Sequence, residues 1–372
     1  MRKIDMKTII FIASSIFYRE DGYKTRIMME IEKLKKNNNI ILFLPHYPKT
    51  DVIFPDNIIV EKYATDYGHK FHYIRNNLSF RKSLKKLLDN NKDGIVIGES
   101  LIPSIKSIGI VKARKLRFVF DCHGTEPDEY RMKYPGIRGN IFFTILKLFE
   151  NKVVKNSDLL ITVTEYQFEL WNCKRKNHVV LPMMPSKQFY INPGINRVLV
   201  RKKLDILEEE EVYVYSGQNQ KWQMCEETID IFKKISLKRN NARLIILTNK
   251  EEYFKKLCQD KNIKNVIILS VPYKEMPQYL DACDYGFCIR NSSIVNKVAS
   301  PTKVLEYVAR NVKPILSEYV GDFSEVLPKK GLASIWHDSI DYLKEQPFKG
   351  IDYVLELNNE VDENYRNAIS QL

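Results

Sequence analysis

Residues 298–309 read VASPTKVLEYVA and combine a helix start with two opposite charges. Ser300 is a natural N-cap, because its hydroxyl can accept a hydrogen bond from the first turn, and Pro301 suits the first helical position, where no N–H is needed. A helix that starts here directs the backbone N–H groups of Thr302 and Lys303, and the positive end of its dipole, at an anion such as a diphosphate.

Glu306 lies three residues after Lys303 and therefore shares its helix face. Lys303 adds a full positive charge to the anion site, and the carboxylate of Glu306 can accept hydrogen bonds from a pair of sugar hydroxyls beside the anion. A diphosphate next to a diol is the outline of a nucleotide sugar. The alternative interpretation is a capped surface helix with an i,i+3 ion pair.

Length, charge and cysteine content limit the class of protein. The chain has 372 residues and 44% hydrophobic residues, which is enough for about two domains with cores. Its net charge of +13 indicates anionic partners. We expect no nucleic acid among them, because the sequence has neither a zinc-finger spacing nor a ribonucleoprotein-type aromatic motif. The six cysteines form no C-x-x-C pair, which disfavours a structural zinc site and favours reduced thiols in the cytosol.

The N-terminus contains an apolar run at residues 8–17 that follows three basic residues, as in a signal peptide. The run is short and lacks a convincing cleavage site, so we interpret it as a buried first strand. No other stretch approaches the roughly 18 apolar residues needed to cross a bilayer. We therefore expect a cytoplasmic protein, either soluble or peripheral on the inner face of the cytoplasmic membrane.

Short apolar runs alternate with amphipathic ones along the chain, a pattern typical of parallel βαβ units. We expect strands at 8–13, 40–44, 58–63, 94–97, 117–121, 159–163, 212–215, 243–248, 266–269, 285–289 and 313–316. We expect helices at 24–36, 71–90, 102–114, 138–156 and 226–237, besides the one that starts near residue 301. The fold class is α/β, with two facing Rossmann-like doubly wound domains and a central cleft.

The boundary between the two domains falls at residues 181–196, where prolines, a glycine and asparagines interrupt all periodicity and suggest a linker. The first domain is expected at residues 1–185 and the second at 197–350, and a C-terminal helix near 355–372 would pack back on the first. Both halves open with a strand, a glycine, basic residues and a helix, with Gly22 in one half and Gly217 in the other.

Four blocks of the second half resemble the donor-binding domain of retaining glycosyltransferases with the GT-B fold, of the branch called family four. These blocks are YSGQNQKWQ at 215–223, RNSS at 290–293, SPTKVLEY at 300–307 and KPIL at 313–316. The resemblance implies transfer of a sugar, with retention, from a nucleotide-diphosphate sugar of the UDP type. The acceptor would be a glycan or a lipid-diphosphate-linked saccharide in surface-polysaccharide synthesis, and no metal or other cofactor is expected.

The resemblance also assigns donor-binding roles in the second domain. Gly217 and Lys221 would hold the donor diphosphate together with Lys303 and the N–H groups around Thr302. Glu306 matches the second glutamate of the family's E-x7-E motif, which binds the nucleotide ribose. Ser300 and Pro301 would complete this wall of the donor site.

At two positions in or near these blocks the sequence departs from the family pattern, and a third position could compensate for one of these departures. Val298 stands where the first glutamate of the E-x7-E motif is expected, which puts the orientation of the donor sugar in doubt. Gln218 stands where an arginine is often found. Arg290, at the end of an expected strand, could supply the missing charge, and an exposed loop cation is the equally weighted alternative.

The first domain is expected to contribute acceptor-side residues after the strand at 117–121. His123 matches a histidine that many family members place near the transferred sugar, although a lone strand-end histidine is often structural. Glu126 and Glu129 are weaker acceptor candidates, with helix-start carboxylates as the alternative. Gly22 could let the backbone approach the donor phosphates, and a plain turn explains it almost as well.

In the expected reaction, the catalytic residues are His123, Lys221 and Lys303. The transferred sugar becomes oxocarbenium-like while the nucleotide diphosphate leaves, so the lone cations stabilise the leaving group without a metal. Basic and apolar residues at 81–86, 112–117 and 138–149 suggest an anionic membrane surface that carries a lipid-linked acceptor. The alternative for the last segment is a core helix.

Two other classes stay open. A catalytically idle GT-B protein that binds sugar nucleotides and serves as a scaffold in a polysaccharide assembly complex is the stronger rival, because of Val298. A GT-B epimerase is the other.

Overall fold

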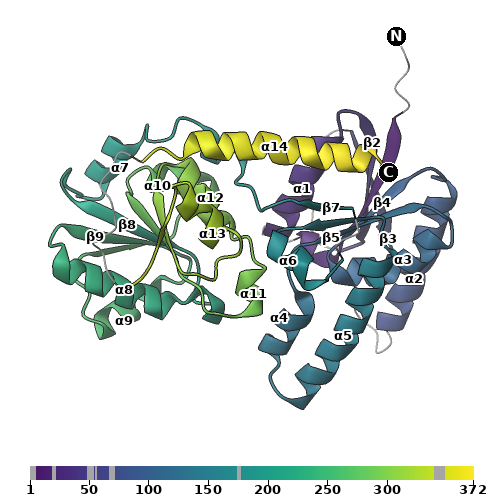
Figure 1. Cartoon of the computed structure of the whole chain (residues 1–372), viewed down its shortest axis with the longest axis horizontal. Coiled ribbons are helices and arrows are strands. Elements are labelled where there is room, and N and C mark those ends of the chain that lie inside the picture. The colour runs from purple at the N-terminus through teal and green to yellow at the C-terminus, as the bar shows by residue number, and fades with distance from the viewer. Residues whose placement is uncertain are drawn as a thin grey trace, which may run out of the picture. The chain divides into compact units, whose positions relative to one another are not determined.

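The computed structural model describes residues 6–18, 22–47, 54, 57–66, 72–173, 177–338 and 348–372. The chain divides into two compact units, which are described separately. The first unit comprises Met1–Pro182 together with Val361–Leu372, and the second comprises Met183–Glu360. Each unit contains one parallel β-sheet with helices on both faces (Figure 1). No helix among the described residues is long and apolar enough to span a bilayer.

The first unit is built on a seven-stranded sheet with the order β3-β2-β1-β4-β5-β6-β7. Its strands are β1 (Lys7–Ile12), β2 (Asn38–Pro45), β3 (Ile58–Tyr63), β4 (Ile95–Glu99), β5 (Arg117–Cys122), β6 (Leu159–Thr162) and β7 (His178–Val180). Its helices are α1 (Gly22–Leu34), α2 (His72–Asp89), α3 (Leu101–Lys112), α4 (Glu126–Lys133), α5 (Ile137–Asn156) and α6 (Glu165–Leu170). The order reverses at β1, so polar residues that follow β1, β4 and β5 gather at one edge of the sheet.

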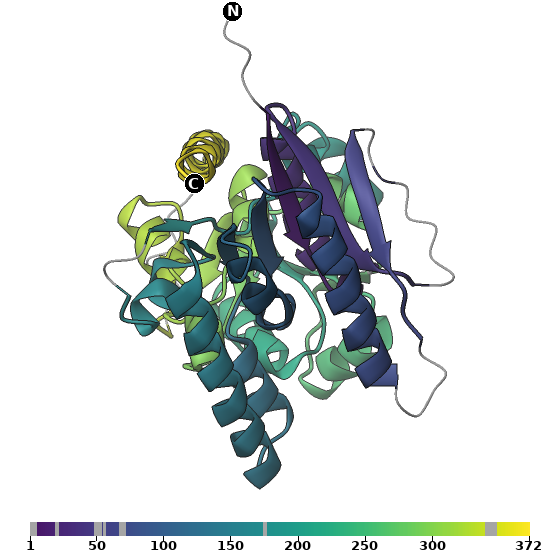
Figure 2. The ribbon, with the colours of Figure 1, turned by 90° about the vertical axis from the view of Figure 1, so that its right-hand side faces the viewer.

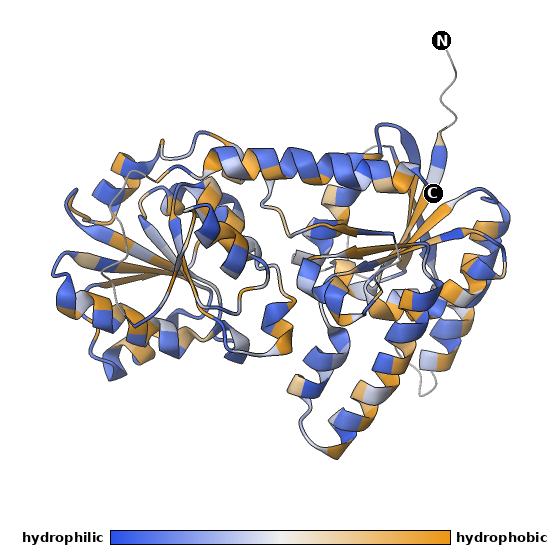
Figure 3. Ribbon diagram, in the orientation of Figure 1, coloured by the Kyte–Doolittle hydropathy of each residue, from blue (hydrophilic) through white to orange (hydrophobic). Residues whose placement is uncertain are grey.

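Helices α2, α3 and α5 cover one face of this sheet (Figure 2). Phe80, Leu84 and Leu88 of α2 are buried against strand residues such as Phe43 and Phe118. The strands are apolar on both faces because helices cover both of them, and Figure 3 shows them as the most hydrophobic part of each unit.

The second unit has a six-stranded parallel sheet with the order β10-β9-β8-β11-β12-β13. Its strands are β8 (Glu211–Ser216), β9 (Ala242–Leu247), β10 (Val266–Leu269), β11 (Tyr285–Cys288), β12 (Lys313–Leu316) and β13 (Ser334–Ile335). Its helices are α7 (Arg197–Lys203), α8 (Cys225–Lys238), α9 (Glu251–Asp260), α10 (Met276–Leu280), α11 (Ile294–Lys297), α12 (Thr302–Ala309) and α13 (Phe323–Lys329). A Cβ on Gly286 of β11 would lie 2.4 Å from the Tyr307 ring, so this glycine lets α12 approach the sheet closely.

The last helix, α14 (Ile351–Ser370), begins in the second unit and ends in the first. In the first unit, the Tyr365 hydroxyl donates a 2.9 Å hydrogen bond to the Glu30 carboxylate of α1. Lys33 and Asp362 form an ion pair between the same two helices. The end of α14 is therefore fixed to α1 by polar contacts as well as by apolar packing.

The α/β class and the parallel sheets are as the sequence predicts, and the expected strands and helices differ from the observed ones by about one or two residues at their ends. Sequence patterns missed the two short strands β7 and β13 and seven helices, most of them too short to show a clear period: α4, α6, α7, α9, α10, α11 and α13. The expected linker at 181–196 is wrong for its larger part. Asp281 accepts hydrogen bonds from the Gly194 and Asn196 N–H groups, and the Arg310 guanidinium donates to the Ile191 carbonyl, so this segment packs on the second unit.

The helix start at residue 300 also needs correction. Helix α12 begins at Thr302, and Pro301 is the N-cap residue. Ser300 is not a cap, because its hydroxyl accepts a hydrogen bond from the Met183 N–H at 3.0 Å. Ser300 thus binds the first residue of the second unit, and the N-cap lies one residue after the position that the sequence suggested.

Candidate functional site

The turn after β8 brings Gly217 and Lys303 together. Gly217 has φ +153°, a conformation that side chains with a Cβ rarely adopt. A Cβ at this position would lie 2.4 Å from Gln223 Oε1 and 3.0 Å from Lys303 Nζ. The Lys303 ammonium therefore lies directly beside the backbone of the glycine turn, although 86 residues separate the two in sequence (303 − 217 = 86).

Side chains at the end of β8 hold this turn in place. The Tyr215 hydroxyl donates to the Gln218 carbonyl at 2.7 Å and to Gln223 Oε1 at 3.0 Å. The Gln218 N–H donates to the same Gln223 oxygen at 3.0 Å. Lys303 Nζ lies 4.8 Å from the centre of the Tyr215 ring, a cation–π distance. Tyr215 thus fixes both the turn and the lysine.

Lys303 and Arg290 form a positively charged pair at this turn. Burial and, to a smaller extent, the charge of Arg290 lower the pKa of Lys303 to about 8. Arg290 is only 9% exposed, and its guanidinium donates a 3.0 Å hydrogen bond to the Trp222 carbonyl. It is therefore a buried cation close to Lys303, and not the exposed loop residue of the alternative interpretation. Two cations held this close favour an anionic ligand.

Glu306 lies one turn further along α12, as the sequence predicts. It is 5% exposed, and its carboxylate accepts a 2.7 Å hydrogen bond from the Tyr273 hydroxyl. Burial raises the pKa of Glu306 to about 7, although Tyr273 and Lys303 act against this shift. No sequence signal pointed to Tyr273, because it lies in a short 3-10 turn, Tyr273–Glu275, between β10 and α10.

The start of α12 leaves backbone donors beside the lysine. The Val304 N–H already donates to the Pro301 carbonyl at 3.1 Å, while the N–H groups of Thr302 and Lys303 precede the first helical hydrogen bond. Val298 is 1% exposed and lies at the end of α11. The position expected for a glutamate is therefore a buried apolar one in this chain.

Lys221, the other expected phosphate ligand, begins a short 3-10 turn (Lys221–Gln223) and is exposed. Among the described residues, no hydrogen bond or ion pair connects its side chain with Gly217, Lys303 or Arg290. The structure thus brings together Gly217, Arg290, Lys303 and Glu306, and leaves the role of Lys221 a prediction.

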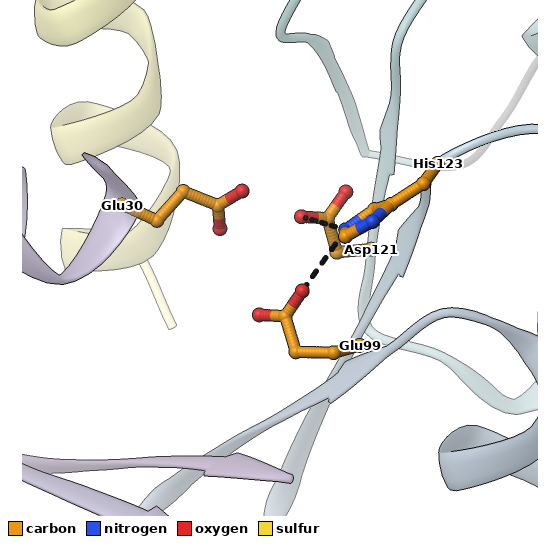
Figure 4. A group of neighbouring side chains, drawn as sticks. All are labelled: Glu30, Glu99, Asp121 and His123. Carbon is orange, nitrogen blue, oxygen red and sulfur yellow. Dashed lines mark hydrogen bonds and ion pairs between the residues drawn. The ribbon is translucent and has the colours of Figure 1, made fainter. Parts of the chain in front are cut away.

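His123 follows β5 in the first unit and lies in a cluster of acidic residues (Figure 4). Its Nε2 atom is 3.0 Å from Glu99 Oε2 and 3.2 Å from Asp121 Oδ2. The His123 ring also lies 5.2 Å from the Tyr23 ring, and the Tyr23 hydroxyl donates to the Glu99 carbonyl at 3.2 Å. These partners come from α1, β4 and β5, so the sheet edge holds the imidazole from three directions.

Charge in this cluster keeps His123 protonated. Burial opposes protonation, but Asp121 and Glu99 outweigh it and raise the pKa of His123 to about 10. Burial raises the pKa of Glu99 to about 7. Burial alone would also raise the pKa of Asp121, but Arg26 and His123 lower it. At neutral pH, His123 is therefore a hydrogen-bond donor and a positive charge, and it cannot act as a general base.

Glu30, Glu99, Asp121 and His123 place potential metal ligands within 4.8 Å of one another. The Arg26 guanidinium already occupies this group, because it forms ion pairs with Glu30 and, at 3.2 Å, with Asp121. It also donates to the Leu181 carbonyl. A buried arginine satisfies the charge that a divalent cation would otherwise supply. The cluster is thus better described as an ionic network that holds His123.

The acceptor candidates near His123 have different surroundings. Glu126 is the first residue of α4, as the alternative of a helix-start carboxylate has it, and its carboxylate accepts a hydrogen bond from the Leu101 N–H at the start of a different helix, α3. Burial raises the pKa of Glu126 to about 7. Glu129 is exposed on α4, with one oxygen near Gly124. Gly22 is the first residue of α1.

A pocket of about 310 Å³ opens at the edge where β1, β2 and β3 end. We call it the carboxyl-edge pocket. Its lining is polar and aromatic and includes Ser14, Tyr63, Tyr73, Asn77 and Lys106. The Ser14 N–H donates a 3.1 Å hydrogen bond to the Tyr23 hydroxyl, whose ring lies beside His123. The pocket therefore adjoins the histidine cluster through Tyr23.

The sequence missed most partners of the candidate residues. Arg26 and Glu30 lie at i and i+4 on the buried face of α1, and a charged pair on such a face was one signal for the ionic network. Glu99 ends β4, and a carboxylate at a strand end was a second signal. Tyr365 and Tyr273 had none, because their positions follow only from the packing.

Comparison with known proteins relates the chain to one family and one fold. Residues 197–369 match the family described as glycosyl transferases group 1. No curated protein sequence is significantly similar to the chain.

Three solved structures illustrate the likeness in fold. WaaG, a glycosyltransferase involved in lipopolysaccharide biosynthesis, is 14% identical with a TM-score of 0.62, covering 98% of this chain and 95% of its own. WaaB, a lipopolysaccharide outer core galactosyltransferase, is 15% identical with a TM-score of 0.65, covering 99% and 100%. HepE from Anabaena in complex with UDP is 12% identical with a TM-score of 0.61, covering 98% and 95%. The fold is therefore that of the GT-B glycosyltransferases.

Proposed function

We propose that this protein transfers a sugar from a nucleotide-diphosphate sugar to an acceptor in surface-polysaccharide synthesis, because residues 197–369 match the family described as glycosyl transferases group 1 and the chain has a GT-B fold. One observation carries the proposal. The Lys303 ammonium lies beside the Gly217 turn, with Arg290 nearby and Glu306 one helical turn away. This arrangement matches a diphosphate with a ribose diol next to it.

In the second unit, each side chain has a definite task toward a UDP-sugar. Lys303, Arg290 and the N–H groups that start α12 bind the diphosphate and stabilise the negative charge that develops on it as it leaves. The Gly217 backbone can approach the phosphates closely because no Cβ intervenes. Glu306, held by Tyr273, accepts hydrogen bonds from the ribose hydroxyls.

The transfer proceeds with retention and without a metal in this proposal. The bond between the anomeric carbon and the diphosphate oxygen breaks, and the acceptor oxygen forms its bond to the same face of that carbon. The acceptor proton moves to the leaving diphosphate, so no protein base is needed. This agrees with a protonated His123, which can donate a hydrogen bond to a sugar hydroxyl but cannot accept the proton.

The acceptor is assigned to the first unit. The carboxyl-edge pocket has the mixture of hydroxyl, amide and aromatic groups that binds saccharides, and it adjoins His123 through Tyr23. An acceptor saccharide bound there would be recognised by groups such as Asn77 and Tyr73.

A second candidate function is a sugar-nucleotide-binding scaffold without transferase activity. Val298 favours it, because a buried valine cannot bind the donor sugar as a glutamate could. The two candidates make the same prediction for UDP binding and opposite predictions for turnover, so the experiment below measures both.

The test is thermal unfolding with a panel of UDP- and other nucleotide sugars, followed by assays for hydrolysis and transfer. A ligand that binds only the folded state raises the midpoint of unfolding. Lys303→Ala should abolish the shift, because the diphosphate then loses the full positive charge of the ammonium that binds it. Glu306→Gln should reduce the shift. Lys238→Ala, an exposed lysine at the end of α8, is the matched control and should retain it.

Stabilisation by a nucleotide sugar together with slow hydrolysis supports the transferase. Stabilisation without any turnover would point to the scaffold. If no nucleotide sugar stabilises the wild-type protein, both candidate functions are wrong.

A further inference from the structure

A groove of about 440 Å³ lies between α2, α3 and α5, on the helical side of the first sheet. We call it the lipid groove. Its apolar floor is formed by Ile105, Ile108 and Val153, and Phe149 of α5 forms one wall. A Cβ on Gly109 of α3 would meet no atom within 4 Å, so the middle of the groove is open. It is distinct from the carboxyl-edge pocket, and Lys106 is the one residue that lines both.

The rim of the groove is strongly basic. Arg81, Lys85, Lys106 and Lys152 are exposed, and none of the four side chains has a carboxylate partner among the described residues. Arg114 is the exception, because it pairs with Asp89 at 2.8 Å. The lining residues include no acidic side chain. Uncompensated cations around an apolar floor favour a ligand that is both anionic and apolar.

Exposed apolar side chains continue from the groove along both flanking helices. On α5, Ile141 is 54% exposed and Leu148 is 66% exposed, and residues 141, 145, 148 and 152 share one helix face. On α2, Ile74 and Leu78 are each 62% exposed and share a face with Arg81 and Lys85. Figure 3 shows hydrophobic and hydrophilic residues alternating along α5. On each of the two helices, a stripe of exposed apolar side chains is therefore followed by basic side chains on the same face.

The spatial order of these groups, with apolar side chains next to cations, corresponds to the boundary between acyl chains and phosphate groups in a membrane. A nucleic acid would not match the apolar floor, and a soluble sugar phosphate would not use the stripes. We propose that the lipid groove binds a lipid diphosphate, with the phosphates at Arg81, Lys85, Lys106 and Lys152 and the chain on the apolar floor.

The position of Lys106 connects this ligand with the acceptor. Lys106 lies one helical turn after Ile102 and Pro103, which line the carboxyl-edge pocket, and one turn before Gly109 and Ile110, which line the groove. A lipid diphosphate in the groove therefore directs a sugar attached to it into the carboxyl-edge pocket. Identifying this lipid as the acceptor rests on the proposed transferase function, whereas binding of the lipid diphosphate does not.

The experiment uses the full chain and four variants in two matched pairs. Arg81→Gln with Lys85→Gln removes two groove cations, and Lys82→Gln with Lys86→Gln removes two exposed cations of the same helix that do not line the groove. Gly109→Leu fills the open middle of the groove, and Gly109→Ala adds only a methyl group. Both glycine variants should fold, because leucine and alanine favour a helix more than glycine does.

The measurement is binding to detergent micelles that contain a polyprenyl diphosphate, compared with micelles that contain the uncharged polyprenol. We expect the wild type, Lys82→Gln/Lys86→Gln and Gly109→Ala to prefer the diphosphate micelles. Arg81→Gln/Lys85→Gln and Gly109→Leu should each weaken that binding by about tenfold or more, which corresponds to about 1.4 kcal/mol.

Three outcomes would overturn the proposal. Equal losses in the two double variants would show that only the surface charge matters. Unchanged binding by Gly109→Leu would show that the lipid does not enter the groove. Full displacement of the micelles by inorganic diphosphate at matched concentration would show that the apolar floor plays no part. UDP-induced stabilisation, measured in parallel, tests the donor site separately, so its failure leaves the result for the groove unaffected.

Discussion

The buried position of the Lys303 ammonium costs folding free energy, although the same position suits the binding of an anion. Burying the ammonium beside Arg290 costs free energy and lowers its pKa to about 8, while the Tyr215 ring and Glu306 compensate in part. A bound diphosphate would offset this cost, because its negative charge stabilises both cations. Functional sites commonly hold such perturbed groups.

The pKa of Lys303 predicts how ligand affinity depends on pH. Below about pH 8 the free protein carries the ammonium charge, so Lys303 itself should not change the affinity for UDP there. Above that value the lysine loses its proton, and the dissociation constant should rise by up to about tenfold per pH unit. Calorimetric titration of UDP from about pH 7 to about pH 9 measures this effect.

Lys303→Arg is the control for this prediction, because arginine keeps its charge over the whole range. Its affinity for UDP should lack the loss above pH 8. Any effect of Glu306, whose pKa is about 7, is common to both proteins, so the difference between them isolates the lysine. A wild-type affinity that stays constant above pH 8 would contradict the prediction.

At the scale of the elements, α14 acts on the histidine cluster from a distance in sequence. Tyr365 donates to Glu30, Glu30 pairs with Arg26, Arg26 pairs with Asp121, and Asp121 contacts His123. Tyr365, Glu30, Arg26 and Asp121 are buried, and each hydrogen bond satisfies a group that would otherwise be costly to bury. The C-terminal helix is therefore part of the network that holds His123.

Tyr365→Phe tests this connection. The variant keeps the ring but leaves the buried Glu30 carboxylate with one hydrogen bond fewer, so we expect a loss of about 1–3 kcal/mol in the free energy of unfolding. Tyr353→Phe on the same helix is the control. The Tyr353 hydroxyl makes no hydrogen bond among the described residues, and this change should cost less than about 0.5 kcal/mol. Urea denaturation of both variants gives the comparison, and equal losses would refute the role of Tyr365.

At the scale of the whole molecule, the two units distribute charge in opposite ways. The first unit gathers carboxylates around Arg26 and His123, and the second gathers Lys303 and Arg290 at the start of α12. Protein cations can neutralise a leaving diphosphate in the second unit, and Arg26 fills the carboxylate cluster in the first. On this basis we expect the proposed transfer to need no divalent metal.

We predict that sugar transfer persists after exhaustive treatment with EDTA and is not increased by added Mn²⁺ or Mg²⁺. The assay is release of the nucleoside diphosphate from the donor that stabilises the protein. Activity that disappears with EDTA and returns with Mn²⁺ would show that a metal takes part, and Glu30→Gln would then identify whether the carboxylate cluster binds it.

The sequence alone determined the order of strands and helices, and with it the α/β class, because apolar periodicity depends only on local spacing. It also identified Gly217, Lys303 and Glu306, since a strand-end glycine and a helix start with a charged face are local signals. It placed the start of α12 one residue early, because a serine before a proline resembles an N-cap unless its hydroxyl has another partner, here the Met183 N–H.

Only the tertiary structure decided which of these residues meet. The approach of Lys303 to Gly217 results from α12 packing against the sheet, which Gly286 permits. The ionic network of Arg26, Glu30, Asp121 and Tyr365 joins residues that lie hundreds of positions apart in the chain, and the lipid groove exists only where α2, α3 and α5 pack side by side. Sequence patterns report the face that a residue occupies on its own element, whereas a site depends on how separate elements pack together, and that information is not local.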